Sequence, residues 1–293
     1  MILCAGEALI DMLPRDTPEG AAFLPVPGGA VFNTAVALGR LGAPVAFHCG
    51  VSTDLFGKRL TEALAASQVD DRTARSDRPT TLAFVTLRDG HAEYAFYDEG
   101  TAGRMLTPED APDMRGVSAL FVGGISLAVE PCAGAFEALA LGHPGLPLMI
   151  DPNVRPGFVR DEAAYRARIA RLLAAADVVK LSDEDMGWLR MTPGDVLAAG
   201  ASVLCLTEGA RGVRAITAGG EVHVLAPRVA VVDTVGAGDT FNAGFLAGLH
   251  RAGALGKSVP AEGALRAALE LGVRAAAVTV SRAGANPPWA HEL

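Results

Sequence analysis

The sequence has little of what marks several large classes of protein. Its four cysteines are scattered and form no CxxC pair, so we expect small buried thiols in a reducing cytoplasm rather than disulfides or a cysteine metal site. No apolar run approaches the roughly 18 residues of a membrane-spanning helix. The chain also opens without the basic and apolar stretches of a signal peptide, so we expect a cytoplasmic protein with no membrane partner.

Basic residues and metal motifs are also scarce. Lysine and arginine number 25 against 33 aspartates and glutamates, and the net charge of −8 disfavours nucleic acid as a partner. The six histidines show neither HExxH nor paired ligand spacing, which argues against a catalytic zinc ion. Gly256-Lys257-Ser258 resembles the end of a Walker A loop, but Arg251 stands where that loop needs a glycine.

Apolar residues and glycines, by contrast, are abundant. Half of the 293 residues are apolar and 34 are glycine, enough for a large core in one or two α/β domains. From residue 117 onward strands and helices alternate, which predicts right-handed crossovers and a mostly parallel sheet covered on both faces. We expect strands over 117–122, 146–150, 178–181 and 202–206, helices over 131–141, 161–175, 184–189 and 193–199, and a hairpin of 213–217 with 221–225.

The first hundred residues predict a smaller structure beside this sheet. Residues 2–10 have the pattern of one strand, 14–27 leave the main sheet, and 82–87 with 92–97 flank an Asp-Gly turn, a strong hairpin signal. A small sheet of this kind has one apolar face, which substrate or a second subunit has to cover. We therefore expect a lid over about 12–27 and 79–101 within a single domain of residues 1–293, and a homodimer through that lid.

The segment from Asp233 to Phe245 is the strongest functional signal. Val229 to Val232 has the pattern of a short buried strand, the turn Gly236-Ala237-Gly238 follows, and a helix begins there. Unpaired amides at a helix start, together with the positive end of the helix dipole, favour an anion such as phosphate. Asp239 either complements the helix dipole or accepts a proton from an attacking hydroxyl.

A second glycine turn begins at Gly28 and Gly29. The helix that follows is rich in small apolar residues and is closed by Gly42 at its C-terminal cap. A glycine pair lets a ligand approach the backbone closely, and Asn33 offers both a donor and an acceptor to a polyol. The alternative is that Asn33 only caps the helix.

Polar residues follow three of the predicted strands, at the edge where ligands bind in parallel sheets. They are Asp151-Pro152-Asn153-Val154-Arg155, Ser182-Asp183-Glu184-Asp185 and Thr207-Glu208-Gly209. Carboxylates there can hold the waters of Mg²⁺ and a guanidinium can neutralise phosphate, the two needs of phosphoryl transfer. For Ser182 and Asp185 a plain helix-capping box is an equal alternative.

Asp-Thr-Val-Gly-Ala-Gly-Asp-Thr-Phe at 233–241 resembles the C-terminal signature of the ribokinase-like (PfkB) carbohydrate kinases, and the run from Gly28 resembles their N-terminal signature. The resemblance extends from Gly6 to Pro288, and Glu-Ala-Leu-Ile-Asp, Asp-Pro-Asn-x-Arg-Pro and Lys-x-Ser-Asp-Glu-Asp are phrases of the bacterial fructokinases. It implies an α/β fold, the ribokinase-like three-layer α/β/α sandwich with a mostly parallel central sheet and a small β-sheet lid. The implied reaction moves the γ-phosphoryl group of ATP to a terminal hydroxymethyl of a ketohexose, first of all fructose.

The resemblance also implies roles for individual residues. Asp239 would be the catalytic base, beside an anion hole formed by the amides of Ala237, Gly238 and Asp239. Sugar would be held by Asp11, Gly28, Gly29, Asn33 and Asp239, with Arg104 and Arg155 binding sugar or phosphate. ATP would lie along Ser182, Thr207, Glu208, Gly209, Gly236, Gly238, Gly284, Ala285 and Asn286. Asp185 would hold Mg²⁺ through water, and the backbone around Asp233 and Val235 would hold K⁺.

Two departures from the family pattern keep alternatives open. Ala102-Gly103-Arg104 stands where fructokinases have Ala-Asp-Arg, and Ser182-x-x-Asp185 replaces the Asn-x-x-Glu magnesium motif. Arg104 and Arg155 together would also suit the carboxylate of a sugar acid, as in the related 2-keto-3-deoxygluconate kinases. A sensor that binds sugar or nucleotide without catalysis is the alternative from another class.

Overall fold

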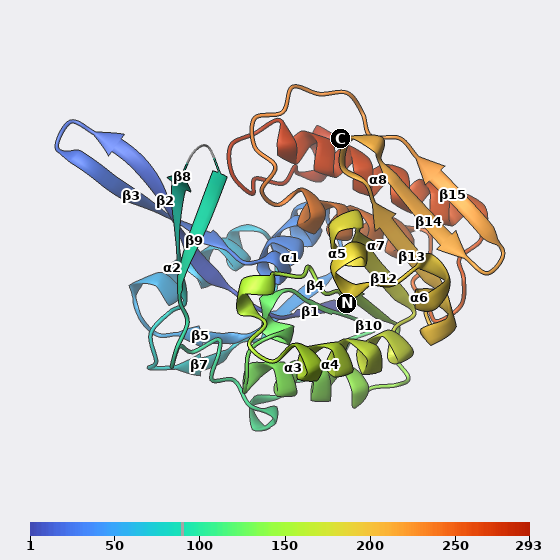
Figure 1. The fold of residues 1–293 in the computed structure, drawn as a ribbon, viewed down its shortest axis with the longest axis horizontal. Coiled ribbons are helices and arrows are strands. Elements are labelled where there is room, and N and C mark those ends of the chain that lie inside the picture. Colours follow the sequence, from blue (N-terminus) through green and yellow to red (C-terminus); the bar gives the residue numbers. More distant parts are fainter. Residues whose placement is uncertain (89–90) are drawn as a thin grey trace.

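The computed structural model describes the backbone of residues 1–88 and 91–293 and the side chains of all these residues except 85–88 and 91–94. Within that part, a nine-stranded sheet runs in the order β15-β14-β13-β12-β11-β10-β1-β4-β6 (Figure 1). Its parallel strands are β1 (Ile2–Ala5), β4 (Val45–His48), β6 (Asp70–Asp71), β10 (Ala119–Gly123), β11 (Leu148–Asp151), β12 (Val178–Ser182) and β13 (Val203–Thr207). The predicted hairpin of β14 (Val213–Thr217) and β15 (Gly220–Val224) adds an antiparallel edge.

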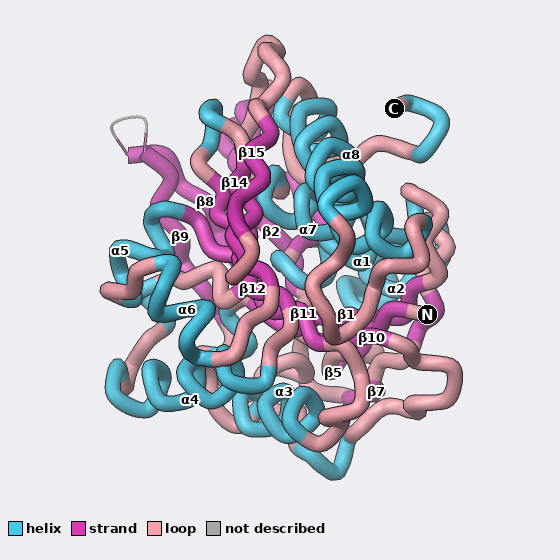
Figure 2. Tube along the Cα trace, turned by 90° about the vertical axis from the view of Figure 1, so that its right-hand side faces the viewer, coloured by secondary structure: helices cyan, strands magenta, loops and turns pink. Residues whose placement is uncertain are grey.

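Helices cover both faces of this sheet (Figure 2). One face carries α1 (Ala30–Arg40), α2 (Leu55–Ala66), α7 (Ala237–Arg251) and α8 (Glu262–Val280), and the other carries α3 (Cys132–Leu141), α4 (Glu162–Ala175), α5 (Asp183–Leu189) and α6 (Pro193–Ala199). Strand β1 shows why both faces are apolar: Ile2 and Cys4 enter the first core, whereas Leu3 and Ala5 enter the second. The predicted three-layer α/β/α sandwich is confirmed.

A small sheet stands away from the main one at the left of Figure 1, in the order β3-β2-β8-β9. It consists of β2 (Leu9–Thr17), β3 (Gly20–Gly28), β8 (Leu82–Arg88) and β9 (His91–Tyr97). These strands occupy most of the two segments expected to act as a lid, and that action stays a prediction. The Asp89-Gly90 turn predicted between β8 and β9 lies outside the described residues. A further strand pair joins β5 (Gly50–Ser52) to β7 (Ala74–Ser76).

Two predicted strands are wrong. Residues 2–10 are not one strand, because the chain bends at Gly6 and passes from β1 in the main sheet to β2 in the small sheet. Val229 to Val232 form no strand and are not buried, since Val231 is 64% and Val232 62% exposed. The amide of Val232 donates to the carbonyl of Val280 at the end of α8, so this segment is fixed by a helix end rather than by a neighbouring strand.

Helix α7 is packed closely against α8 through glycines. A methyl group at Gly244 would lie 2.6 Å from Cα of Gly272, and one at Gly248 would lie 2.5 Å from Cα of Ala268. This close approach sets the position of α7 as a whole, and the first turn of α7 carries Asp239. The four cysteines are buried and free, as predicted. Among the described residues, no helix combines the length and the apolar character needed to cross a bilayer.

Candidate active site

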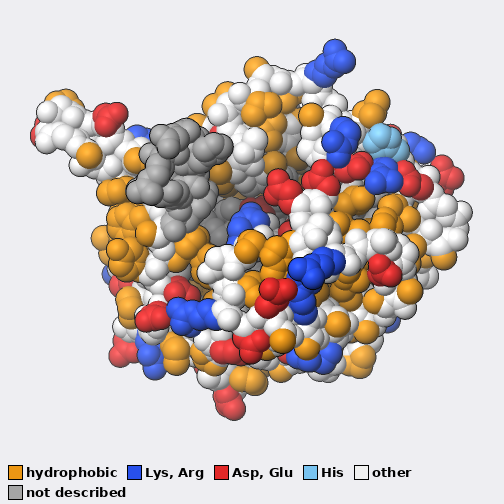
Figure 3. Space-filling view, viewed as in Figure 1, with side chains coloured by type: hydrophobic (Ala, Val, Ile, Leu, Met, Phe, Trp, Pro, Cys, Tyr) orange, Lys and Arg blue, Asp and Glu red, His pale blue; other side chains and the backbone are white. Residues whose placement is uncertain are grey.

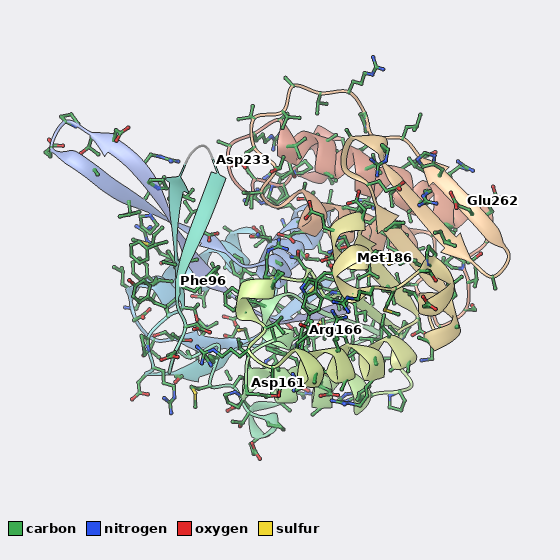
Figure 4. The ribbon with its side chains drawn as sticks, viewed as in Figure 1. Phe96, Asp161, Arg166, Met186, Asp233 and Glu262 are labelled. Carbon is green, nitrogen blue, oxygen red and sulfur yellow. The ribbon has the colours of Figure 1, made fainter. Side chains whose placement is uncertain are left out.

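A cavity of about 750 Å³ opens between the small sheet and the carboxyl ends of the main strands. Its walls come from β2, β9, the start of α1, the loop after β11 and the turn before α7. In Figure 3, acidic and basic side chains gather around a hollow near the middle of this face. Figure 4 labels Phe96, which lines the cavity from β9, and Asp233, the neighbour of the lining residue Thr234.

The glycine turn before α7 supplies donors to this cavity. Gly236 caps the helix at φ 77°, a conformation that favours glycine, and a methyl group there would lie 2.8 Å from Cβ of Ala285. Within the described residues the amides of Gly238 and Asp239 have no protein acceptor, whereas that of Ala237 donates to the Thr234 carbonyl at 3.3 Å. Two of the three expected amides are therefore available to an anion.

Asp239 lines the cavity at the start of α7 and is only 8% exposed. Its Oδ2 accepts a hydrogen bond from Nδ2 of Asn33 at 2.9 Å. Burial raises the pKa of this carboxyl to about 7; the Asn33 hydrogen bond opposes the shift, and the charge of Asp151 adds to it. A carboxylate with a pKa near neutral is suited to accept a proton in the cell.

The predicted sugar-binding glycines make room for the Asp11 carboxylate and for the Glu7 backbone. A methyl group at Gly28 would lie 2.1 Å from Oδ2 of Asp11, which lines the cavity and whose pKa burial raises to about 6. Gly29 has φ 106°, and a methyl group there would lie 2.7 Å from the Glu7 carbonyl. Larger residues at either position would displace the polar wall of the cavity.

Glu7 also lines the cavity; the sequence marks it as a charge inside an apolar segment that has to be satisfied or used, without giving it a specific role. Its Oε1 accepts from the amide of Ala30 at 3.0 Å and its Oε2 from the amide of Ser126 at 3.3 Å. Burial raises the pKa of Glu7, which these hydrogen bonds partly offset. Glu7 therefore closes the N-terminal end of α1 and adds a carboxylate to the cavity that Asp11 also lines.

The two arginines expected at the substrate differ in their surroundings. Nη1 of Arg104 lies 3.0 Å from Oδ2 of Asp98, and its Nε donates to the Glu130 carbonyl at 3.2 Å. Nη1 of Arg155 donates to the Val154 carbonyl at 3.1 Å and, within the described residues, pairs with no carboxylate. Both arginines line the cavity, but among the side chains that the structure describes only Arg104 of the two has a carboxylate partner, so Arg155 brings the uncompensated positive charge.

A buried lysine and aspartate lie beneath the glycine turn. Nζ of Lys180 is 3.2 Å from Oδ2 of Asp151, and the same oxygen accepts from Nδ2 of Asn242 at 2.7 Å. Lys180 and Asp239 line the cavity together. Lys180, Asp151 and Asn242 come from β12, β11 and α7, so only the folded chain brings them together.

The residues expected along the nucleotide fall into two groups, and none of them lines the cavity except those of the glycine turn. Gly284, Ala285 and Asn286 lie against that turn, since the Gly284 amide donates to Oδ2 of Asp233 at 2.9 Å. Oδ1 of Asn286 accepts from Arg40 at 3.0 Å.

The second group lies along the edge of the sheet. Thr207 is beside Ser182, and Glu208 forms an ion pair with Arg214 at 3.1 Å. Gly209 begins a short 3-10 turn at φ 57°. The nucleotide role of both groups stays a prediction.

The carboxylates expected near metal ions are already engaged. Oδ1 of Asp185 accepts from the Val154 amide at 2.8 Å, and its Oδ2 accepts from the amide and hydroxyl of Ser182, which completes a capping box on α5. Asp185 therefore does not fit as a direct ligand of Mg²⁺. Oδ1 of Asp233 accepts from the Val235 amide at 3.0 Å, and K⁺ there would depend on backbone carbonyls. Both ions stay predictions.

Comparison with known proteins gives the family. Residues 1–292 match the pfkB family of carbohydrate kinases. The chain belongs to this family. It is 52% identical over 259 residues to the fructokinase of Rhizobium leguminosarum bv. trifolii, a match that covers 85% of this chain and 79% of the relative. The predicted pfkB membership is thus confirmed.

Solved structures agree with this membership. The fructokinase of Xylella fastidiosa with bound ATP matches at a TM-score of 0.89 and 31% identity, covering 97% of this chain and 93% of that one. A fructokinase double mutant from Vibrio cholerae O395, bound to fructose, ADP and a potassium ion, matches at 0.85 and 26% identity, covering 97% and 93%. The pfkB fold therefore extends over nearly the whole chain.

Sequence reasoning gave no role to several residues of this pfkB cavity. Glu7, Asp98 and Lys180 line it, and Asn242 donates a hydrogen bond to Asp151, the ion-pair partner of Lys180. A signal for Lys180 was present, because a lysine inside the apolar run 178–181 has to be paired or used. No local signal could have connected it with Asn242, which comes 62 residues later in the chain.

Proposed function

We propose that this carbohydrate kinase transfers the γ-phosphoryl group of ATP to O6 of fructose, giving fructose 6-phosphate and ADP. One observation carries the proposal: the Asp239 carboxylate lines the same cavity as Gly238 and Asp239, whose backbone amides have no acceptor among the described residues. A base for the hydroxyl and donors for the moving phosphoryl group are what this reaction needs. The fructokinases found among its relatives support fructose as the acceptor.

In the proposed mechanism, O6 attacks the γ-phosphorus in line while Asp239 takes the hydroxyl proton. Asn33 holds the Asp239 carboxylate toward the cavity. The two free amides and the guanidinium of Arg155 would face the phosphoryl charge, which is spread over the three equatorial oxygens in the transition state. Mg²⁺, when bound with ATP, would supply further charge neutralisation at the phosphates.

The charges of the cavity favour a neutral sugar over a sugar acid. Arg104, one of the two cations that a carboxylate would need, is already paired with Asp98 inside the cavity. Glu7, Asp11 and Asp239 add carboxylates to the cavity. Sugar hydroxyl groups can donate hydrogen bonds to them, whereas the negative charge of a sugar acid would be repelled. We therefore propose fructose as the substrate in preference to 2-keto-3-deoxygluconate.

A panel of sugars with coupled detection of ADP tests this function. We expect fructose to give the highest kcat/KM, 2-keto-3-deoxygluconate to be poorer, and ADP formation without sugar to be negligible. If the enzyme prefers 2-keto-3-deoxygluconate and Arg104→Ala loses that preference, the sugar acid and not fructose is the substrate. Binding of sugar and ATP with no sugar-dependent ADP formation would point instead to a sensor.

The proposal includes a homodimer through the small sheet, in a cytoplasm that supplies ATP. Phe23, Phe84 and Tyr97 form a row of edge-to-face aromatic contacts across β3, β8 and β9, with ring centroids 5.0 and 5.5 Å apart. Phe23 is 42% and Tyr97 64% exposed. An exposed aromatic row on a small sheet fits the same face of a second copy.

A further inference from the structure

Lys180 is buried in the centre of the main sheet, in strand β12. Its side chain is only 5% exposed, and Asp151, its acidic partner, is 3% exposed. Two ions out of water cost more free energy than their attraction returns unless geometry and further hydrogen bonds are favourable. Two apolar residues at these positions would not carry this cost in the free energy of folding. The buried pair is therefore a candidate for a functional role.

The pair is built to hold Asp151 still. One of its oxygens accepts from Asn242 at 2.7 Å, and the other accepts from the Asn153 amide at 3.1 Å. Both oxygens also lie near Nζ of Lys180, at 3.2 and 3.4 Å. Both oxygens of Asp151 are thus occupied, and this carboxylate holds the ammonium group of Lys180 in a fixed position.

The ammonium group is less completely surrounded than its partner. Within the described residues its hydrogen bonds go to Asp151 alone, which leaves part of its three-donor capacity unused. Lys180 lines the cavity, and a methyl group on Gly238 would lie 3.4 Å from its Nζ. Nζ therefore lies close to Gly238, one of the two residues whose amides have no acceptor within the described part of the chain.

The group is an ammonium ion at neutral pH. Burial by itself lowers the pKa of Lys180, but the nearby carboxylates Asp151 and Asp185 outweigh it and the pKa rises above its ordinary value. Gly238, Asp239 and Lys180 line the same cavity from two elements of the fold.

We propose that Lys180 is a further catalytic residue, whose ammonium group donates a hydrogen bond to a non-bridging oxygen of the γ-phosphoryl group as it moves. The inference rests on the proposed kinase function. In the step, the bond from the acceptor oxygen to phosphorus forms and the bond from phosphorus to the β-phosphate oxygen breaks, with its electron pair leaving on ADP. The hydroxyl proton goes to Asp239, and Lys180 keeps its proton throughout.

Three variants test Lys180. Lys180→Met removes the charge, and Lys180→Met with Asp151→Asn removes both charges so that no buried carboxylate is left alone. Lys257→Met is the matched control, because Lys257 also pairs with a buried aspartate, Asp177 at 3.4 Å, but lies outside the cavity. Thermal melts show whether each variant folds.

The first readout is turnover. We expect both Lys180 variants to lose about 10²–10³ in kcat, the usual effect of removing one transition-state donor, with KM for fructose within about threefold. Lys257→Met should keep the wild-type kcat. Turnover within about fivefold of wild type in either folded Lys180 variant would overturn the inference. If neither variant folds while Lys257→Met does, the pair is structural and the inference also fails.

The second readout separates this inference from the function itself. Wild type is first assayed with the sugar panel, and absence of any sugar-dependent ADP would count against the kinase function rather than against Lys180. Binding of ADP alone and of ADP with Mg²⁺ and aluminium fluoride, which takes the place of the moving phosphoryl group, is then measured by calorimetry. We expect Lys180→Met to weaken only the aluminium fluoride complex. Equal weakening of both would assign Lys180 to structure.

Discussion

At the scale of single residues, the cavity is defined by carboxylates that burial has made less acidic. Asp239, Asp11 and Glu7 all have pKa values raised by desolvation, and each lies where a glycine or a helix start brings the backbone close. The same burial that costs stability makes Asp239 a base with its pKa near 7. The chemistry at this scale depends on charge and burial together.

The pH dependence of kcat/KM should report Asp239. With a pKa of about 7, the base is mostly protonated below that pH, so the rate should fall about tenfold per unit below pH 6 and level off above pH 8. Asn33→Ala removes a hydrogen bond to the charged Asp239 carboxylate, which should raise its pKa and move the acidic limb of the pH profile to higher pH. A limb that stays in place or moves to lower pH in Asn33→Ala would contradict the assignment.

Asp98 should control the choice between neutral sugars and sugar acids. Asp98→Asn frees Arg104 from its ion pair, and we expect kcat/KM for 2-keto-3-deoxygluconate to rise relative to fructose by at least tenfold. The double variant Asp98→Asn with Arg104→Ala is the control and should lose that gain. An unchanged ratio in Asp98→Asn would show that Arg104 does not face the substrate.

At the scale of helices and strands, the sequence predicts regular elements well and exceptions poorly. The helices over 131–141, 161–175 and 193–199 appear within one residue of their predicted bounds: Pro131 precedes the first, and Asp161 and Thr192 cap the other two. The run Val229 to Val232 has the composition of a strand, but its partner is the end of α8, about 50 residues later. Propensity cannot reveal which neighbour is available.

The site was predictable to the same degree. The glycine turns and Asp239 are contiguous motifs, so sequence alone brought them forward as candidates. The pairings of Arg104 with Asp98 and of Lys180 with Asp151 are contacts of the folded chain, and they decide whether each charge is free. Sequence therefore indicates which residues to consider, and the fold determines what each can do.

The contact between α7 and α8 can be tested with one substitution at two places. Gly244→Ala puts a methyl group 2.6 Å from Cα of Gly272, and we expect it to lower the free energy of unfolding by roughly 1–3 kcal/mol. Gly263→Ala, in α8 with nothing within 4 Å, should be neutral or stabilise by up to about 1 kcal/mol. Urea midpoints compare the two, and equal effects would contradict the close packing.

At the scale of the whole molecule, the sandwich provides the rigid wall of the cavity and the small sheet provides its other side. Phe96 of β9 packs edge-on against Phe158 at 4.3 Å, and Glu99 pairs with Arg160 at 3.0 Å, so the small sheet is attached to the loop after β11. The exposed outer residues of that sheet form the surface that a second copy would cover in the proposed dimer.

The proposed dimer should depend on Phe23 and Tyr97 of the aromatic row, which are 42% and 64% exposed. We expect the wild-type chain to have twice the mass of one chain by light scattering, and Phe23→Ser with Tyr97→Ser to have the mass of one. A surface double variant elsewhere, Leu225→Ser with Val259→Ser, should remain dimeric. A monomeric wild type at micromolar concentration would remove the dimer from the proposal.

The central claim is that Asp239 deprotonates the acceptor while the turn beside it holds the phosphoryl group, and Asp239→Asn tests this most directly. Asparagine keeps the shape and removes the charge, whose burial opposes folding above pH 7, so the variant should melt no lower than wild type at pH 8. We predict calorimetric affinities for fructose and ATP within about threefold of wild type and a loss of about 10²–10⁴ in kcat. Near-wild-type turnover in the folded variant would contradict the account.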